Sequence, residues 1–259
     1  MKECKDKKLL INMNNIVKRY YVGEPNELEI LHGIDVKIYE GEFVAIVGES
    51  GSGKSTLMNI IGVLDKPTEG EYYLDGINVR NATEKDMNNI RNQKIGFVFQ
   101  NFNLIGRTSA LKNVELPMLY AGISSKKRTE RAMELLKKVG MEERCNHQPN
   151  ELSGGQKQRL SIARAIAKEP EIYIFDDSFS ALDFKTDAKL RRALKEETGD
   201  ATVLIVAQRI STILHAEQIV VLDQGKIVGI GNHKQLLKNC EVYKEIALSQ
   251  LSKEELENE

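Results

Sequence analysis

The 259-residue sequence lacks three features that would each indicate a particular class of protein. No apolar run approaches the roughly 20 residues of a membrane-spanning helix, and no apolar core follows the charged residues 1–8, so we expect neither a span nor a signal peptide. The three cysteines are scattered and never form a CxxC pair, which favours reduced thiols over disulfides or a zinc site. A net charge of -1 gives no support for nucleic-acid binding. We therefore expect a cytoplasmic protein that reaches any membrane through a partner.

Strand and helix signals alternate along the chain. The apolar run at residues 42–47 is typical of a strand buried on both faces of a parallel sheet. Other strands are expected at residues 9–16, 30–39, 94–99, 171–175 and 201–207, with hairpins at 71–79 and 218–230. Residues 101–150 show helical periodicity instead, with Met133, Leu135, Leu136 and Val139 as one stripe.

This pattern predicts an α/β fold with a mostly parallel sheet and an N-terminal antiparallel β subdomain. We expect one domain over residues 1–259. Residues 1–100 and 151–259 form its core with the β subdomain, and residues 101–150 form an inserted α-helical subdomain.

A glycine-rich stretch, residues 48–56, fits the pattern G-x-x-x-x-G-K-[ST] and lies between the apolar strand and a helix expected from Lys54. Its glycines let backbone N–H groups face a phosphate chain, and the helix start adds partial positive charge. We expect Lys54 to reach the β- and γ-phosphates and Ser55 to ligate Mg²⁺. A plain glycine turn is the alternative, but the strand, spacing, lysine and serine together favour a P-loop NTPase (RecA-like) core that binds a nucleoside triphosphate. Its expected binding residues are Gly48, Ser50, Gly51, Ser52, Gly53, Lys54, Ser55 and Thr56.

Two carboxylates, Asp176 and Asp177, follow the apolar residues 172–175. At the carboxyl edge of a parallel sheet, Asp176 would lie beside the glycine-rich loop and hold Mg²⁺ through water. A solvated turn is the alternative for such a pair.

The string Leu152-Ser153-Gly154-Gly155-Gln156 precedes a helix expected at residues 157–167. Ser153 is placed to cap that helix, and the two glycines expose backbone N–H groups, which makes a second anion-binding helix start. One triphosphate has no need for two such cradles. The string resembles the signature motif of ABC (ATP-binding cassette) ATPases, although a capped helix with a glycine turn is the more common source of an isolated SGG.

The resemblance covers nearly the whole chain. It implies a head-to-tail dimer in which Ser153, Gly154, Gly155 and Gln156 of each chain close on the ATP held by the other. It further implies that Gln100 senses Mg²⁺ and the transport partner, and that residues 180–183 cross the dimer interface. Tyr20 matches the aromatic residue that stacks on adenine; Tyr21 could substitute for it, and ordinary packing is the alternative.

Two residues depart from the family's hydrolysis machinery. Asp177 replaces the glutamate that polarises the attacking water, and it is one methylene shorter. Gln208 replaces a histidine that contacts the γ-phosphate, and glutamine carries neither proton nor charge there. The resemblance assigns catalysis to Lys54, Gln100, Asp177 and Gln208, and Mg²⁺ to Ser55, Gln100 and Asp176, and the two departures predict slow hydrolysis at this chain's own site.

The two parts of the chain resemble different branches of the family. Residues up to about 150 are similar to ATPases of the lipoprotein-release and macrolide-export type, whereas those from 171 onward are similar to the degenerate-site domain of heterodimeric exporters. A recombined chain is one interpretation, and a natural ATPase that has drifted is the other.

The sequence thus predicts the ATP-binding and hydrolysing subunit of an ABC transporter, with ATP and Mg²⁺ as cofactors and a second such domain and a transmembrane permease as partners. The alternative is a module that dimerises with ATP but scarcely hydrolyses it. A soluble ABC protein acting on ribosomes or DNA is disfavoured, because the chain has one cassette, a short helical insert and no basic patch.

Overall fold

The computed structural model describes residues 7–176 and 197–251. The chain forms two compact units, one of Met1–Asn88 with Thr202–Glu259 and the other of Asn89–Ala201. Asp177 and residues 180–183 lie outside the described residues. Among the residues that the structure describes, no helix combines the length and the apolar character needed to cross a bilayer.

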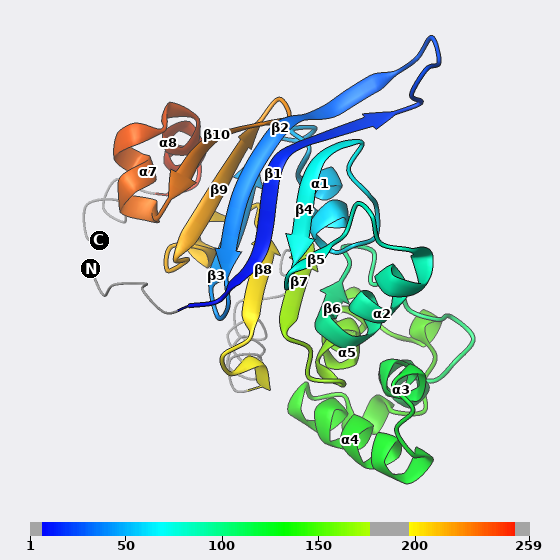
Figure 1. Cartoon of the computed structure of the whole chain (residues 1–259). Helices are drawn as coiled ribbons and strands as arrows, with labels where there is room; N and C mark the ends of the chain where they lie inside the picture. Colours follow the sequence, from blue (N-terminus) through cyan, green and yellow to red (C-terminus); the bar gives the residue numbers. More distant parts are fainter. Residues whose placement is uncertain (1–6, 177–196, 252–259) are drawn as a thin grey trace. The chain divides into compact units, whose positions relative to one another are not determined.

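The first unit contains an antiparallel sheet built around a long hairpin. Strands β1 (Leu9–Tyr20) and β2 (Leu28–Tyr39) pair over most of their length, as Figure 1 shows. Strands β4 (Glu69–Leu74) and β5 (Ile77–Asn78) complete the order β2-β1-β4-β5. Apolar side chains such as Ile11, Met13 and Ile34 are fully buried, so one face of this sheet forms a core. The predicted N-terminal antiparallel β subdomain is confirmed.

The same unit contains parallel strands that carry the glycine-rich loop. Strand β3 (Phe43–Gly48) runs parallel to β8 (Thr202–Val206) on one side and to β9 (Gln218–Asp223) on the other. Strand β10 (Lys226–Gly231) pairs antiparallel with β9. Residues 44–47 of β3 are all buried, as a strand covered on both faces requires.

The described part of this unit also contains short helices and a 3-10 turn. Helix α1 (Lys54–Ile61) follows the glycine-rich loop and buries Leu57, Ile60 and Ile61, as predicted. Beyond β8 lie η3 (Ile210–Thr212), α7 (His233–Asn239) and α8 (Glu241–Leu248).

The second unit combines two parallel strands with helices. Strand β6 (Ile95–Val98) pairs in parallel with β7 (Ile172–Asp176). Between them lie α3 (Ala110–Tyr120), α4 (Ser125–Lys138), η1 (Glu142–Arg144), η2 (Pro149–Glu151) and α5 (Gly154–Ile166). Helix α3 packs against both α4 and α5. The helical character of residues 101–150 is therefore confirmed, while the bounds of a separate inserted subdomain stay a prediction.

Helix α2 (Glu84–Lys94) was not predicted from the sequence. Only Met87 and Ile90 of this helix are buried apolar residues, so the helix has almost no hydrophobic stripe. Its start was nevertheless encoded, because Thr83 Oγ1 accepts a hydrogen bond from the Asp86 N–H and Asp86 Oδ2 accepts one from the Thr83 N–H. In α4, the predicted stripe is shifted: Ala132 is buried and Met133 is only half-buried.

Candidate nucleotide-binding site

The glycine-rich loop is shaped by positions where only glycine fits. A Cβ on Gly48, which has φ 152°, would lie 2.1 Å from the carbonyl oxygen of Leu222 and 2.7 Å from Ser52 Oγ. Gly53, with φ 99°, packs against Leu31 and the Ile30 carbonyl. At Gly51, by contrast, no atom lies within 4 Å of a Cβ position, and the residue is exposed. The loop is therefore tight against the protein on one side and open on the other, as a phosphate cradle must be.

Lys54 and the start of α1 complete this cradle. Gly53 is the N-cap residue of α1 in a left-handed conformation and provides no side-chain cap, which leaves the first N–H groups of the helix for a ligand. Lys54 Nζ donates hydrogen bonds to the carbonyl oxygens of Gly48 and Glu49. Ser55 is exposed in the first turn. The sequence-predicted residues 48–56 thus form one continuous surface.

The expected adenine-stacking residue lies at the end of β1. Lys18 Nζ lies 4.9 Å from the centre of the Tyr20 ring and donates a 2.7 Å hydrogen bond to Asp65 Oδ1. The Tyr20 hydroxyl lies 3.4 Å from the other oxygen of Asp65. An adenine stacked on Tyr20 would therefore use the ring face opposite Lys18. Tyr21 is 59% exposed and has φ 56°.

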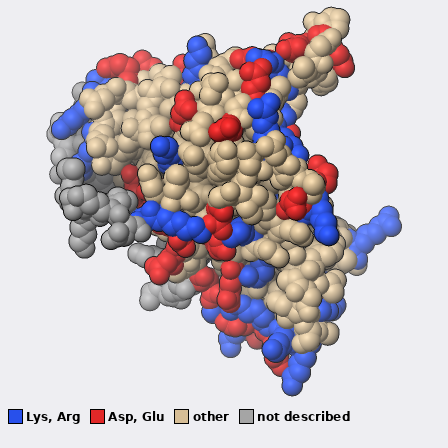
Figure 2. All heavy atoms as spheres, viewed as in Figure 1, with Lys and Arg blue, Asp and Glu red and all other residues tan. Residues whose placement is uncertain are grey.

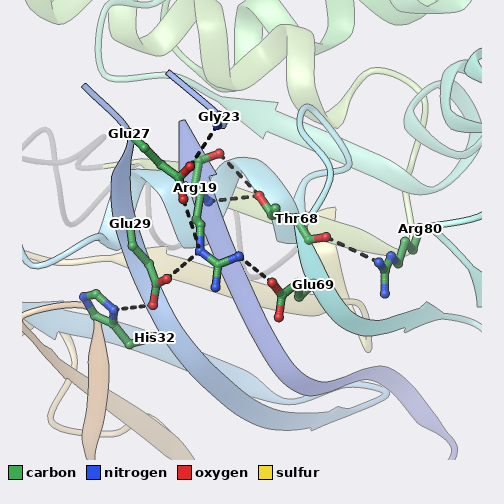
Figure 3. Close-up of polar contacts among 8 residues, drawn as sticks. All are labelled: Arg19, Gly23, Glu27, Glu29, His32, Thr68, Glu69 and Arg80. Atoms are coloured by element: carbon green, nitrogen blue, oxygen red, sulfur yellow. Dashed lines mark hydrogen bonds and ion pairs between the residues drawn. The ribbon is translucent and has the colours of Figure 1, made fainter. Parts of the chain in front are cut away.

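An ion-pair network holds the strand that carries Tyr20. Figure 3 shows Arg19 of β1 between Glu29 of β2 and Glu69 of β4, with ion pairs to both. His32 Nδ1 lies 2.7 Å from Glu29 Oε1, and hydrogen bonds from His32 and Arg19 lower the pKa of the Glu29 carboxyl. Because Arg19 forms ion pairs with both strands that flank β1, it holds the end of β1 in place between β2 and β4.

The network continues through the backbone to the glycine-rich loop. The His32 N–H donates to the Gly225 carbonyl at 2.9 Å, and the Gly225 N–H donates to the Ser52 carbonyl at 3.1 Å. A Cβ on Gly225, with φ 75°, would lie 2.2 Å from the Ile30 carbonyl. The turn between β9 and β10 is therefore hydrogen-bonded both to strand β2 and to the glycine-rich loop.

Parallel pairing aligns the other predicted residues in two pairs, one in each unit. In the first unit, Ile46 pairs with Val206, so the glycine-rich loop and Gln208 leave the sheet at the same edge. In the second unit, Val98 pairs with Phe175, so Gln100 and Asp176 also share a carboxyl edge. The carboxyl edge of a parallel sheet is where ligands of such folds bind.

The signature string forms the start of helix α5. Ser153 is the N-cap residue: its Oγ accepts a hydrogen bond from the Gln156 N–H at 3.3 Å, while Gln156 Oε1 accepts one from the Ser153 N–H at 2.8 Å. This reciprocal capping box was not foreseen, and it gives the Gln156 side chain a partner within its own chain. Ser153 and Gly154 are exposed.

Two supporting side chains gave no recognisable signal in the sequence. Gln250, just beyond α8, accepts a 2.9 Å hydrogen bond from the Ile210 N–H, two residues after Gln208. Arg164 of α5 donates to the carbonyls of Phe102 and Asn103, shortly after Gln100. Both bind backbone groups, an N–H for Gln250 and carbonyls for Arg164, and such groups are the same at every residue type, so no motif records them.

Charged side chains of both signs are interspersed on the face shown in Figure 2. The drawn face has no continuous basic area.

Comparisons with known proteins agree on one family. The family model "ABC transporter" matches residues 31–180. The uncharacterised ABC transporter ATP-binding protein YknY of Bacillus subtilis is 46% identical over 220 residues, covering 85% of this chain and 95% of YknY. The macrolide export ATP-binding/permease protein MacB of Nitrosomonas europaea is 42% identical over 220 residues, and this chain spans only 33% of its length.

A solved structure shares the fold. The ATP-binding cassette MJ0796 of Methanocaldococcus jannaschii, a dimer in a post-hydrolysis state bound to ADP and Pi, superposes with a TM-score of 0.81 and 43% identity. The match covers 86% of this chain and 98% of that one. The predicted P-loop NTPase core is confirmed by this likeness, and the chain belongs to the ATP-binding cassette family of ABC transporters.

Proposed function

We propose that this chain is the ATP-binding and hydrolysing subunit of an ABC transporter and works as a head-to-tail ATP-sandwich dimer. The observation that carries this proposal is the exposed start of α5. Its N-cap and first glycine face solvent in the described chain, although a helix start attracts anions. The chain already has a phosphate cradle at residues 48–56, so the second helix start serves the ATP bound by another copy or a related chain.

The residues present fit a nucleotide with Mg²⁺. The open side of the loop at Gly51 has room for a phosphate chain, and Lys54 at its rim supplies the positive charge. Ser55, Gln100 and Asp176 would hold Mg²⁺ with hydroxyl, amide and carboxylate oxygens, which are the ligands that this cation prefers. Tyr20 would stack on the adenine.

We further propose that the chain's own site turns over slowly. Asp177 would hold the attacking water with a shorter side chain than glutamate. Gln208 is exposed at the edge shared with the glycine-rich loop, but its amide cannot carry a positive charge toward the γ-phosphate. An intact signature string in the same sequence as these two departures fits a chain that serves a partner's site, as in degenerate-site dimers.

The second candidate is an ATP-dependent dimerisation module with little or no hydrolysis. It is favoured by the same two residues, because a closed dimer that cannot hydrolyse its ATP persists. The two candidates differ only in the rate at which the closed dimer reopens.

The transport partner is proposed to be a separate membrane permease that holds this chain at the inner face of the cell membrane. MacB, of which this chain spans a third, is named as an ATP-binding and permease protein in one chain. Its remaining length indicates the kind of partner that we propose here. The recombined origin of the chain stays a prediction, since the match with YknY extends across both parts.

The test combines two measurements on the purified chain with Mg-ATP: phosphate release and mass by light scattering. We expect the wild type to dimerise and to release phosphate slowly, and the Asp177→Glu, Gln208→His double variant to release it at least about tenfold faster, which equals about 1.4 kcal/mol of barrier. Dimerisation without release in either protein would favour the module. Absence of ATP-dependent dimers in both would overturn a sandwich dimer between two copies of this chain and would leave a related chain as the partner.

A further inference from the structure

The loop that follows Gln100 contains two adjacent residues in an unfavourable backbone conformation. Phe102 has φ 62° and Asn103 has φ 44°, values that are uncommon for residues other than glycine and unusual for a bulky aromatic. Two local hydrogen bonds shape the turn: the Phe102 N–H donates to Phe99 at 3.0 Å, and the Asn103 N–H donates to Asn101 at 2.7 Å. Such a pair persists only where surrounding groups hold it in place.

Arg164 holds this pair from helix α5. Its Nη1 donates to the Asn103 carbonyl at 2.7 Å and its Nη2 to the Phe102 carbonyl at 2.8 Å. The guanidinium is a rigid planar fork, so two neighbouring carbonyls fix its orientation. Burial lowers the pKa of Arg164, and within the described part of the chain no carboxylate forms an ion pair with it. Among the described residues, its hydrogen-bond partners are these two carbonyl dipoles.

The far end of the same loop is fixed separately. Asn113, on helix α3, is 1% exposed, and its Oδ1 accepts a 2.9 Å hydrogen bond from the Ile105 N–H. Its Nδ2 donates to Thr108 Oγ1 at 2.9 Å and to the Ser109 carbonyl at 3.1 Å. Residues 101–104 therefore lie between Gln100 and this second anchor.

Arg164 lies on the same helix as the signature string. Helix α5 runs without interruption from Gly154 to Ile166 and is capped by Ser153. An α-helix rises about 1.5 Å per residue. Over the length from Ser153 to Arg164, an uninterrupted helix moves as a rigid rod. A pull on the carbonyls of Phe102 and Asn103 is therefore passed to the end that carries Ser153.

We propose that Arg164 is a positioning residue that ties the loop behind Gln100 to the signature helix, so that a change at Gln100 moves Ser153. This inference rests on the proposed function, which assigns Gln100 to Mg²⁺ and Ser153 to the ATP of the partner. The tie itself is independent of any nucleotide, because it is made by Arg164 and two backbone carbonyls. Breaking it should separate ATP binding from ATP turnover.

The test compares Arg164→Ala with Arg159→Ala by hydrogen exchange on the full chain. Arg159 is the matched control, since it is on the same helix and donates to one carbonyl, that of Val139, at 3.2 Å. Without nucleotide, we expect Arg164→Ala to raise the exchange of residues 101–104 about tenfold, and Arg159→Ala to leave that exchange unchanged. Equal effects of the two variants would overturn the inference, whatever ATP does.

A second variant separates strain from the tie. Asn103→Gly removes part of the backbone strain, so in the Arg164→Ala background it should restore exchange protection of the loop. It should not restore turnover: we expect KM for ATP to stay within about twofold of the wild type and kcat to fall about tenfold in both. Full recovery of kcat by Asn103→Gly would show that Arg164 only stabilises the loop and would overturn the tie.

The same experiment with Mg-ATP distinguishes the two proposals. If the wild type binds ATP but gains no protection at residues 153–157, the proposed sandwich dimer fails while the nucleotide-free comparison still tests Arg164. If the wild type is protected there and Arg164→Ala loses that protection at unchanged ATP affinity, both proposals are supported.

Discussion

Helices α1 and α5 both start next to a glycine, but Gly53 at the start of α1 is buried against Leu31 whereas Gly154 of α5 is exposed. Helix α1 has Gly53 as its N-cap residue and no side-chain cap, and it is anchored by four buried apolar side chains. Helix α5 caps itself through Ser153 and Gln156, and three basic side chains on or next to it donate to backbone carbonyls. These are Arg159 to Val139, Arg164 to Phe102 and Asn103, and Lys168 to Arg91 and Asn92.

The difference lies in the helix starts, one without a side-chain cap and one with a capping box. Uncapped N–H groups on a helix held by close packing give a rigid cradle that is complete within one chain. Helix α5 is also held by buried apolar side chains such as Leu160, Ile162 and Ile166, but its capped start satisfies its own N–H groups while no ligand is present. Variants at the two helix starts should therefore fail in different ways.

The largest difference is expected between Gly48→Ala and Gly154→Ala. The first places a methyl group 2.1 Å from the Leu222 carbonyl, which should reduce the free energy of unfolding by about 1–3 kcal/mol and abolish ATP binding. The second meets no atom within 4 Å, so folding and ATP binding to the chain's own loop should be unchanged. Only ATP-dependent dimerisation should weaken. Calorimetric titration with ATP measures ATP binding, and chemical unfolding measures the free energy of unfolding.

This comparison would break if Gly154→Ala also lost ATP binding in the monomer. Helix α5 would then belong to the same site as the glycine-rich loop of its own chain. An unfolding curve that stays unchanged in Gly48→Ala would likewise contradict the tight fit of the loop.

A smaller effect is expected at the cap of α5. Gln156→Ala removes the acceptor for the Ser153 N–H and should reduce the free energy of unfolding by about 0.5–1 kcal/mol. Gln235→Ala is the matched control, because Asn232 and Gln235 form the same capping box on α7. Both variants should lose similar stability in urea titrations, but only Gln156→Ala should weaken the ATP-dependent dimer. Equal dimerisation would show that the cap of α5 has a structural role alone.

The smallest effect concerns Lys168, which follows the end of α5. Burial lowers its pKa to about 8, below the ordinary value of about 10.4 for the unfolded chain. Between these values the unfolded state binds more protons, so the contribution of Lys168 to stability should rise as the pH increases from 8 to 10. Urea unfolding of the wild type and of Lys168→Met at pH 7 and 9.5 measures this contribution as the difference in free energy of unfolding between the two proteins. A stability difference that is the same at both pH values would contradict the lowered pKa.

The strands and the phosphate loop were predictable because each has a local cause in the sequence. The apolar run at residues 42–47 and the glycines at 48, 51 and 53 determine strand, turn and helix within a dozen residues. The capped start at Ser153 was also encoded locally, although the reciprocal role of Gln156 was read only from the structure.

Long-range hydrogen bonds to the backbone could not be predicted. Arg164 reaches carbonyls 61 and 62 residues earlier in the chain, and Gln250 reaches an N–H 40 residues earlier. Such partners depend on how helices and loops pack, and the carbonyl is the same at every residue. Helix α2 was missed for a related reason: it is mostly exposed, so the hydrophobic period that reveals helices is absent.

The most direct test of the sandwich dimer mixes two inactive variants. Lys54→Ala should lose ATP binding, and Ser153→Glu should repel the γ-phosphate of the partner's ATP, so neither alone should dimerise with Mg-ATP. Mixed, they can form one complete site from the loop of one chain and the signature helix of the other. The account predicts ATP-dependent dimers in the mixture, measured by light scattering. Monomers in the mixture and in both single variants, beside a wild type that dimerises, would contradict it.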